Sequence, residues 1–265
     1  MSDQASCASP LFFPLRRWLD LLPSAPDTAA VAELAERFPV LVDGCSHPVR
    51  FVPPPADGAV YECRIWETGQ VATRVNHWHD FFNALVWLTF PKTKNAVSAS
   101  HVRSMTPVGE VRGTMRDALT HFDECGIVVL SSQPALLEML RQFAWKTLFV
   151  EHRADVQKHM RFVVFGHATY EQLLNPFRGL TAKAVLYEVS EDWLQYSPEA
   201  LVAAVDTRLA VDLASGRYTR PRDFQPLPLL GIPGVTVESD DPAYYDDTWQ
   251  FRPGRQRSVS VEPAI

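Results

Sequence analysis

The chain has 265 residues, an apolar fraction of 46% and a formal net charge of −6. This length and composition fit one globular domain with a large hydrophobic core. The negative charge disfavours nucleic acid as a partner, because non-specific binding to duplex DNA depends on neutralising phosphates. No apolar run reaches the roughly 18 residues that a membrane span requires, so we expect no membrane partner either.

The cysteines and the N-terminal residues indicate a compartment. The four cysteines are widely spaced and form no CxxC pair. The first residues, MSDQASCASPLFFPLRRWLD, show no signal-peptide pattern. We therefore expect a cytoplasmic protein without disulfides.

The first predicted elements are two short helices, a proline-rich extended segment and a hairpin. The second helix covers Thr28–Phe38, with Asp27 as its N-cap. Two runs of β-forming residues surround a glycine within Val60–Val75, which is the pattern of a hairpin. A helix over His79–Phe90 follows, and its apolar residues occur on every side, which predicts a buried helix.

Helices and strands alternate in the second half of the chain. An amphipathic helix over Val108–Glu124 precedes a buried strand over Ile127–Leu130. The later predicted elements, in chain order, are a helix from Pro134 towards Leu148, a strand over Arg161–Phe165, a helix over His167–Leu174, a strand over Ala182–Val189 and a helix from Pro198 that stops at Gly216. This order predicts an α/β fold with a mixed sheet covered by helices, since the hairpin adds antiparallel strands.

The two ends of the chain are predicted to differ from its middle. From Phe224 the sequence is rich in proline and then in acidic and aromatic residues, which predicts an irregular C-terminal wrap over the domain. The expected organisation is a loose tail over residues 1–12, a single α/β domain over 13–253 and a disordered tail over 254–265.

One segment resembles a known family. NHWHDFFNALVWLTFPKTKNAVSASH, residues 76–101, resembles the signature of an uncharacterised bacterial family, domain of unknown function 3025. The resemblance continues through RDALTHFDECGIVVLSS, FGHATYEQLLNPFRGLTAKAV and YYDDTWQFRP, from about Tyr61 to Pro253. It implies family membership and a bacterial protein, but no assigned activity, cofactor or catalytic residue.

Polar residues at the start of the predicted buried helix form the first candidate site. His79 and Asn83 lie one helical turn apart and share a face, with Asp80 beside them. We predict that His79 and Asp80 are catalytic and that Asn83 binds substrate. The alternative is structural, with His79 or Asp80 capping the helix and Asn83 pairing with nearby backbone.

Further histidines and carboxylates offer metal ligands. His79, His101 and Asp123 together provide the nitrogen and oxygen donors that divalent ions accept, and we predict Asp123 to be catalytic as well. Asp123 and Glu124 end a predicted helix, where the macrodipole disfavours carboxylates, so a cation is expected beside them. Asp117, on the same polar face, is predicted to bind substrate unless that face is merely solvated. The cofactor stays unknown, with a divalent metal as the candidate.

His167 follows a glycine at a predicted strand-to-helix turn, where open α/β sheets bind ligands. We predict that it is catalytic, with Glu171 one turn later orienting its imidazole. Lys94 is predicted to hold an anionic substrate. The structural alternatives are that His167 caps its helix and that Lys94 belongs to a polar helix start.

Together these residues favour a hydrolase with a His/Asp pocket that acts on a small anionic substrate, with or without a metal. No glycine-rich phosphate loop, GxSxG or HExxH motif is present. The first alternative is a non-enzymatic protein that binds a partner through Tyr244, Tyr245, Trp249 and Phe251. The second is a ββα metal-dependent nuclease built on the predicted hairpin. A small-molecule ligand and a homo-oligomer stay open as partners.

Overall fold

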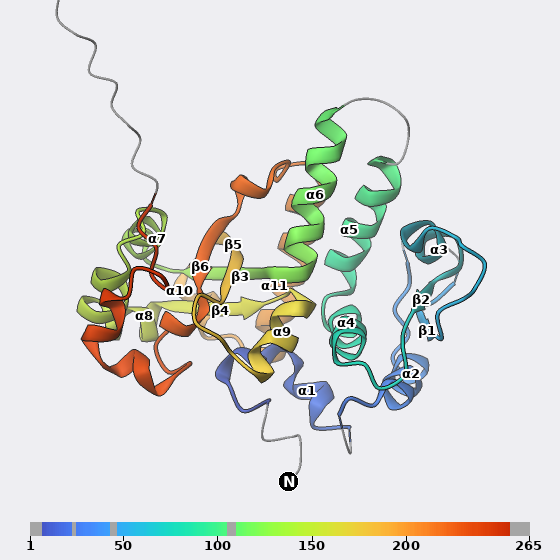
Figure 1. The fold of residues 1–265 in the computed structure, drawn as a ribbon, viewed down its shortest axis with the longest axis horizontal. Coiled ribbons are helices and arrows are strands. Elements are labelled where there is room, and N and C mark those ends of the chain that lie inside the picture. The colour runs from blue at the N-terminus through green and yellow to red at the C-terminus, as the bar shows by residue number, and fades with distance from the viewer. Residues whose placement is uncertain (1–6, 23–24, 43–46, 105–109, 255–265) are drawn as a thin grey trace, which may run out of the picture.

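The computed structural model describes residues 7–22, 25–42, 47–104 and 110–254. A mixed sheet in the order β4-β3-β5-β6 forms the centre, with helices around it (Figure 1). Strand β3 (Gly126–Ser131) pairs in parallel with β5 (Thr181–Glu188) and antiparallel with β4 (Met160–Val164). Strand β6 (Gln225–Pro228) adds antiparallel to β5 at the edge. The predicted class, α/β with a mixed sheet covered by helices, is confirmed.

The remaining elements surround this sheet. The α-helices are α1 (Arg16–Leu19), α2 (Thr28–Arg37), α3 (Tyr61–Thr68), α4 (Trp78–Thr89), α5 (Pro91–Ser104), α6 (Glu110–Cys125), α7 (Pro134–Arg141), α8 (Arg153–His159), α9 (His167–Leu174), α10 (Glu191–Leu194) and α11 (Pro198–Ala214). Short helical turns are η2 (Pro10–Leu15), η3 (Thr147–Glu151), η4 (Pro221–Asp223), η5 (Leu229–Gly231), η6 (Val237–Asp240) and η7 (Pro242–Asp246). A small parallel sheet of β1 (Arg50–Val52) and β2 (Gln70–Ala72) lies with α3 at the opposite end of the molecule from α7 and α8 (Figure 1).

Helix α4 is buried on all sides, as its sequence predicts. Phe81, Phe82, Leu85 and Val86 are each 0% exposed. Helices α9, α2 and α5 and the turn η2 pack around it. Burying each such side chain stabilises the fold by about 1.5–3 kcal/mol, which makes α4 a rigid support for the polar residues at its start.

The predicted hairpin over Val60–Val75 is wrong. Its first half is helix α3, and its second half is β2, which pairs in parallel with β1. Gly69 is the C-cap of α3, with φ of 69°, and a Cβ on it would lie 2.4 Å from the backbone oxygen of Pro48. A left-handed glycine ends a helix as readily as it forms a hairpin turn. The nuclease interpretation therefore loses the hairpin on which it depended.

Pro91 ends α4 and also begins α5, because a proline at the first position of a helix lacks only an unneeded donor. The first amides of α5 bind a buried carboxylate of α11. Asp206 accepts hydrogen bonds from the backbone nitrogens of Lys92 at 3.1 Å and Thr93 at 2.8 Å. This contact joins the start of α5 to α11 and so helps to fix the position of Lys94, the next residue of the helix.

The chain ends depart from the predicted organisation. Part of the predicted loose tail is packed, since Leu11 is 3% exposed and Phe12 is 0% exposed within η2. Residues 1–6, and 255–265 of the predicted disordered tail, lie outside the described residues. The predicted irregular C-terminal wrap contains β6, whose prolines are tolerated because it is an edge strand. Within the part of the chain described, no helix has the length and apolarity that spanning a membrane requires.

Candidate functional site

The antiparallel pairing of β3 and β4 brings two distant segments together. The residues just before β3 meet the residues just after β4, and the oxygen of Gly126 accepts hydrogen bonds from the nitrogens of Phe165 at 3.0 Å and Gly166 at 2.8 Å. A Cβ on Gly166 would lie 2.4 Å from the nitrogen of Gly126, so this approach requires glycine. The end of α6 therefore lies against the start of α9.

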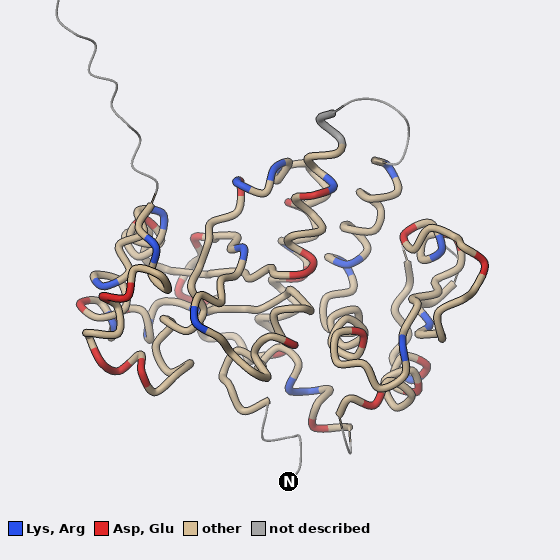
Figure 2. The backbone as a smooth tube through the Cα atoms, viewed as in Figure 1, with Lys and Arg blue, Asp and Glu red and all other residues tan. Residues whose placement is uncertain are grey.

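Helices α3, α4 and α5 complete a cavity at this junction. Figure 2 shows acidic residues at the C-terminal end of α6 and basic residues at the start of α5. The cavity has a volume of about 350 Å³, which is enough for a small ligand. It is lined by Pro54, Tyr61, Glu62, Ala72, Arg74, His79, Asp80, Asn83, His101, Thr120, Asp123, Glu124 and His167.

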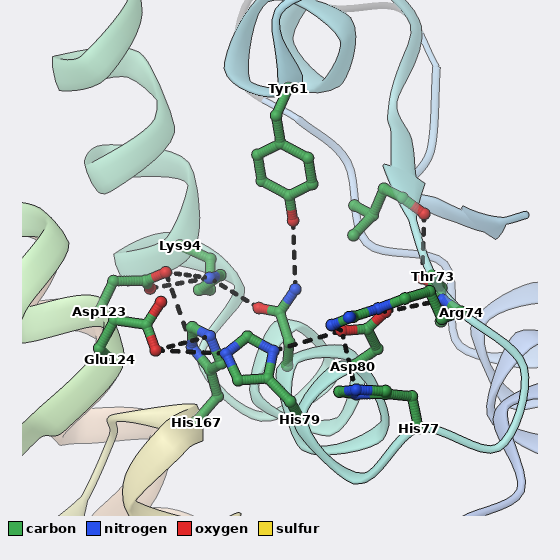
Figure 3. Close-up of polar contacts among 12 residues, drawn as sticks. Tyr61, Thr73, Arg74, His77, His79, Asp80, Lys94, Asp123, Glu124 and His167 are labelled. Atoms are coloured by element: carbon green, nitrogen blue, oxygen red, sulfur yellow. Dashed lines mark hydrogen bonds and ion pairs between the residues drawn. The ribbon is translucent and has the colours of Figure 1, made fainter. Parts of the chain in front are cut away.

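Two imidazoles converge on one carboxylate in this cavity (Figure 3). The Nε2 atoms of His79 and His167 lie 3.3 and 3.5 Å from Oε2 of Glu124. The two rings meet edge to face, with centroids 4.5 Å apart. Donor atoms of the three residues all lie within 4.8 Å of one another. Neighbouring ligands around a tetrahedral zinc ion, with bonds of about 2.0–2.1 Å, are about 3.3–3.4 Å apart. The distances from each imidazole to Glu124 match this spacing.

Each imidazole also has an aspartate on its other side. Nδ1 of His79 lies 3.2 Å from Oδ1 of Asp80, and Nδ1 of His167 lies 3.7 Å from Oδ2 of Asp123. Arg74 holds Asp80 in turn, through Nε at 2.9 Å and Nη2 at 2.8 Å. A carboxylate hydrogen-bonded to the far side of a histidine, as Asp80 is to His79, orients the ring in metal-binding sites. Nδ1 of His167 has no hydrogen-bond partner among the described residues.

Lys94 is the cation that the C-terminal carboxylates of α6 require. Its Nζ donates to Oδ1 of Asn83 at 3.0 Å and to Oδ1 and Oδ2 of Asp123 at 2.7 and 2.9 Å. Lys94 is 4% exposed, and these three oxygens match the three donors of an ammonium group. The predicted role of Lys94 in holding an anion is therefore not supported, because its donors are already used inside the protein.

The protonation states follow from these contacts. The hydrogen bond with Glu124 raises the pKa of His79, whereas burial lowers the pKa of His167 to about 4. Burial opposes ionisation of Asp80, but the hydrogen bonds from Arg74 outweigh it and lower its pKa to about 2. The hydrogen bond from His79 is also the main reason why the pKa of Glu124 is lowered. At neutral pH the cavity thus presents a neutral imidazole beside ionised carboxylates.

The structure changes the predicted ligand set. His101 lines the cavity and is 4% exposed. However, among the described residues the group whose donor atoms lie close enough together to hold a metal ion consists of His79, Glu124 and His167, without His101 or Asp123. The physical reason is that the Asp123 carboxylate is bound to Lys94.

Asp117 is exposed and does not line the cavity. It lies six residues before Asp123, which places it about 9 Å further along α6. Asp123, rather than the predicted Glu171, is the carboxylate beside Nδ1 of His167. Tyr61 and Arg74 are site residues that the sequence did not identify, since both lie within the segment predicted as a hairpin.

The C-terminal aromatic residues pack mainly against the protein itself. Tyr245 and Phe251 are 5% and 4% exposed, and their ring centroids lie 4.7 Å apart. The Tyr245 hydroxyl donates to the oxygen of Gly231 at 2.7 Å. Trp249 is 59% exposed. Most of the surface expected for a partner therefore holds the C-terminal segment on the domain.

The fold and the site define an α/β protein in which a histidine–carboxylate cluster faces a cavity. The model of the family described as "Protein of unknown function (DUF3025)" matches residues 49–255, and the chain belongs to this family. No curated protein and no solved structure matched the chain. This match confirms the resemblance noted in the sequence. The matched range contains every residue that lines the cavity, and the proposed activity follows from the geometry of these residues.

Proposed function

We propose that this protein is a metal-dependent hydrolase whose divalent ion is bound by His79, Glu124 and His167. The observation that carries the proposal is the convergence of two Nε2 atoms on one carboxylate oxygen, at 3.3 and 3.5 Å. Two histidines and a glutamate are also the ligand set of several zinc hydrolases, which leave the fourth position of the ion open.

The surroundings of the three residues support the same proposal. Asp80 lies behind the imidazole of His79, with Oδ1 at 3.2 Å from Nδ1, where it favours the tautomer that presents Nε2 to an ion. Asp123 lies 3.7 Å from Nδ1 of His167 and acts on that ring through its charge. A divalent ion bound there would polarise a substrate oxygen and lower the pKa of water. Hydrolysis is the reaction that this combination of ion, water and cavity serves best.

The cavity favours a neutral substrate over an anionic one. Arg74, the arginine in its lining, is paired with Asp80, and Lys94 lies outside the lining with its donors bound to Asn83 and Asp123. Because each of these two cations is already paired with a carboxylate, neither is available to hold an anionic substrate. We therefore propose a small neutral substrate in place of the anionic one that the sequence predicted.

A hydrolysis assay on the full chain tests the proposal. The protein is stripped with a chelator, reloaded with Zn²⁺ and given p-nitrophenyl acetate, p-nitrophenyl phosphate and bis(p-nitrophenyl) phosphate. We expect one bound ion per chain and zinc-dependent hydrolysis of the acetate ester. Glu124→Gln should abolish both, because it removes the charged ligand that the two histidines share.

Ser132→Ala is the matched control, since Ser132 also contacts a histidine, His159, at 3.1 Å but lies at the other end of β3. This variant should bind zinc and hydrolyse the ester like the wild type. A protein that binds no stoichiometric ion, or whose Glu124→Gln variant binds zinc equally well, would contradict the proposal. Oxygen consumption by the Fe²⁺-loaded protein without any ester hydrolysis would instead indicate an oxygenase.

A further inference from the structure

Tyr61 extends from the first turn of α3 into the cavity (Figure 3). Its hydroxyl contacts the side chain of Asn83. Nδ2 of Asn83 lies 3.2 Å from the Tyr61 hydroxyl oxygen, and Oδ1 of Asn83 lies 3.0 Å from Nζ of Lys94. An ammonium group has donors and no acceptor, so the Asn83 oxygen must face Lys94. The amide nitrogen must then face Tyr61, which makes the Tyr61 oxygen an acceptor.

This orientation leaves the Tyr61 proton for another partner. Among the described residues, the hydrogen bond with Asn83 is the one found for this hydroxyl, and there the tyrosine accepts. A phenol with an ordinary pKa of about 10 keeps its proton at neutral pH. Tyr61 is 39% exposed as a residue, but its hydroxyl lies in the cavity, where desolvation and the neighbouring Glu62 raise its pKa further. The hydroxyl is therefore a neutral donor that lines the same cavity as the histidine–carboxylate cluster.

We propose that Tyr61 is a catalytic hydrogen-bond donor that binds the carbonyl oxygen of an ester or amide substrate and stabilises the negative charge that develops there. The inference rests on the proposed function, and it names the substrate class of the same site. Donors aimed at such an oxygen are among the largest contributors to catalysis of acyl transfer.

The chemistry requires no further reactant. Water adds to the carbonyl carbon, and the bond from that carbon to the leaving alcohol or amine breaks. One proton of the water goes to the leaving group and the other is lost from, or retained by, the carboxylic acid product. Tyr61 keeps its own proton throughout, because it acts by hydrogen bonding.

Charge around the cavity separates an acyl substrate from a phosphoryl one. A phosphate ester needs cations to hold it, and Arg74 and Lys94 are already paired with Asp80 and Asp123. A carbonyl oxygen starts neutral and needs a donor only as the reaction proceeds. One neutral hydroxyl fits that need, whereas phosphoryl groups are usually held by several cations.

The test measures binding of acetohydroxamate to the zinc-loaded full chain by calorimetry. This small ligand chelates zinc and presents a negatively charged oxygen in the place of the developing charge. Tyr61→Phe should weaken its binding about tenfold, as expected for one lost hydrogen bond, and leave zinc affinity unchanged. Tyr196→Phe is the matched control, since Tyr196 is 44% exposed and stacks on Trp193 outside the cavity. Inorganic phosphate should bind more weakly than acetohydroxamate.

The outcomes separate this inference from the proposed function. Absence of zinc binding overturns both. Zinc binding with no hydroxamate binding, or with equal hydroxamate affinity in wild type and Tyr61→Phe, overturns the role of Tyr61 and leaves the metal site standing. Phosphate that binds more tightly than acetohydroxamate overturns the acyl substrate class. Circular dichroism of Tyr61→Phe checks that the variant is folded. Tyr61→Trp keeps an N–H donor and is the second variant, which should bind acetohydroxamate more tightly than Tyr61→Phe.

Discussion

The two ends of the β3–β4 ladder carry similar residues in different arrangements. At one end, Glu124 and His167 meet beside a close glycine contact, and a second imidazole shares the same carboxylate. At the other end, Ser132 and Glu191 both approach Nδ1 of a single histidine, His159, at 3.1 and 3.7 Å. The first arrangement brings three potential metal ligands together at a cavity, whereas the second has one imidazole beside a largely exposed glutamate. The number of potential ligands around one cavity, rather than residue type, is what marks the first end as a candidate site.

Removing the charge that supports the first end should have the largest effect on stability. Lys94→Met leaves the carboxylate of Asp123 buried without its cation, and the two side chains are only 5% and 18% exposed. We expect a loss of about 3–5 kcal/mol in the free energy of unfolding, measured in urea. The double variant with Asp123→Asn should recover part of this loss.

Lys146→Met provides the control for that experiment, because its pair with Asp246 is 47% and 63% exposed. A solvated pair of this kind contributes at most about 1 kcal/mol. Equal losses for Lys94→Met and Lys146→Met would show that the cavity end has no special electrostatic requirement, and the comparison between the two ends would lose its physical basis.

The glycine contact should come next in size. Gly166→Ala places a Cβ 2.4 Å from the nitrogen of Gly126 and 2.5 Å from the oxygen of Glu124, so backbone must move. We expect a loss of roughly 2–3 kcal/mol in unfolding free energy, and weaker zinc binding because Glu124 shifts. Gly113→Ala in α6 meets nothing within 4 Å and should stabilise the helix by up to about 1 kcal/mol. A Gly166→Ala variant as stable as the wild type would contradict the close packing of this end.

A smaller effect should appear in the pH dependence of stability, through Glu62. Burial raises its pKa from 4.5 to about 7, with Asp123 adding to the rise and Lys94, Ser98 and Arg116 opposing it. The folded state then binds the proton more tightly than the unfolded state. Its contribution is fully present below pH 4.5 and is lost as the pH rises to about 7.

A pKa difference of this size corresponds to about 3 kcal/mol, and because Glu62 is only partly buried the expected change between these two limits is at most about 2 kcal/mol. Glu62→Gln has no proton to lose, so urea unfolding across this range should show a flatter profile than the wild type. A parallel profile for the two proteins would mean that Glu62 is solvated, and that the α3 wall of the cavity is more open than described.

The sequence predicted the elements that carry a strong local pattern. The apolar stretches of α4 and β3 were identified because their buried residues are consecutive in the sequence, and β5 was identified from its run of β-forming residues. Helix α3 was missed because a short run of β-forming residues before a glycine fits a hairpin and a helix end equally well.

The site could be predicted only in part, for a geometric reason. His79, Asp123 and His167 were identified as candidates and lie around one cavity. The pairing of Glu124 with both imidazoles depends on the antiparallel direction of β4, which sequence alone did not provide. The use of Lys94 inside the protein likewise depends on its contact with Asp123, a residue 29 positions away.

The most direct test of the central claim is a crystal structure of the zinc-soaked protein with anomalous data at the zinc edge. The account predicts one peak about 2.0–2.2 Å from Nε2 of His79, Nε2 of His167 and a carboxylate oxygen of Glu124. A map without a peak at that point, or with its peak beside His159 and Glu191 at the other end of the ladder, would contradict it.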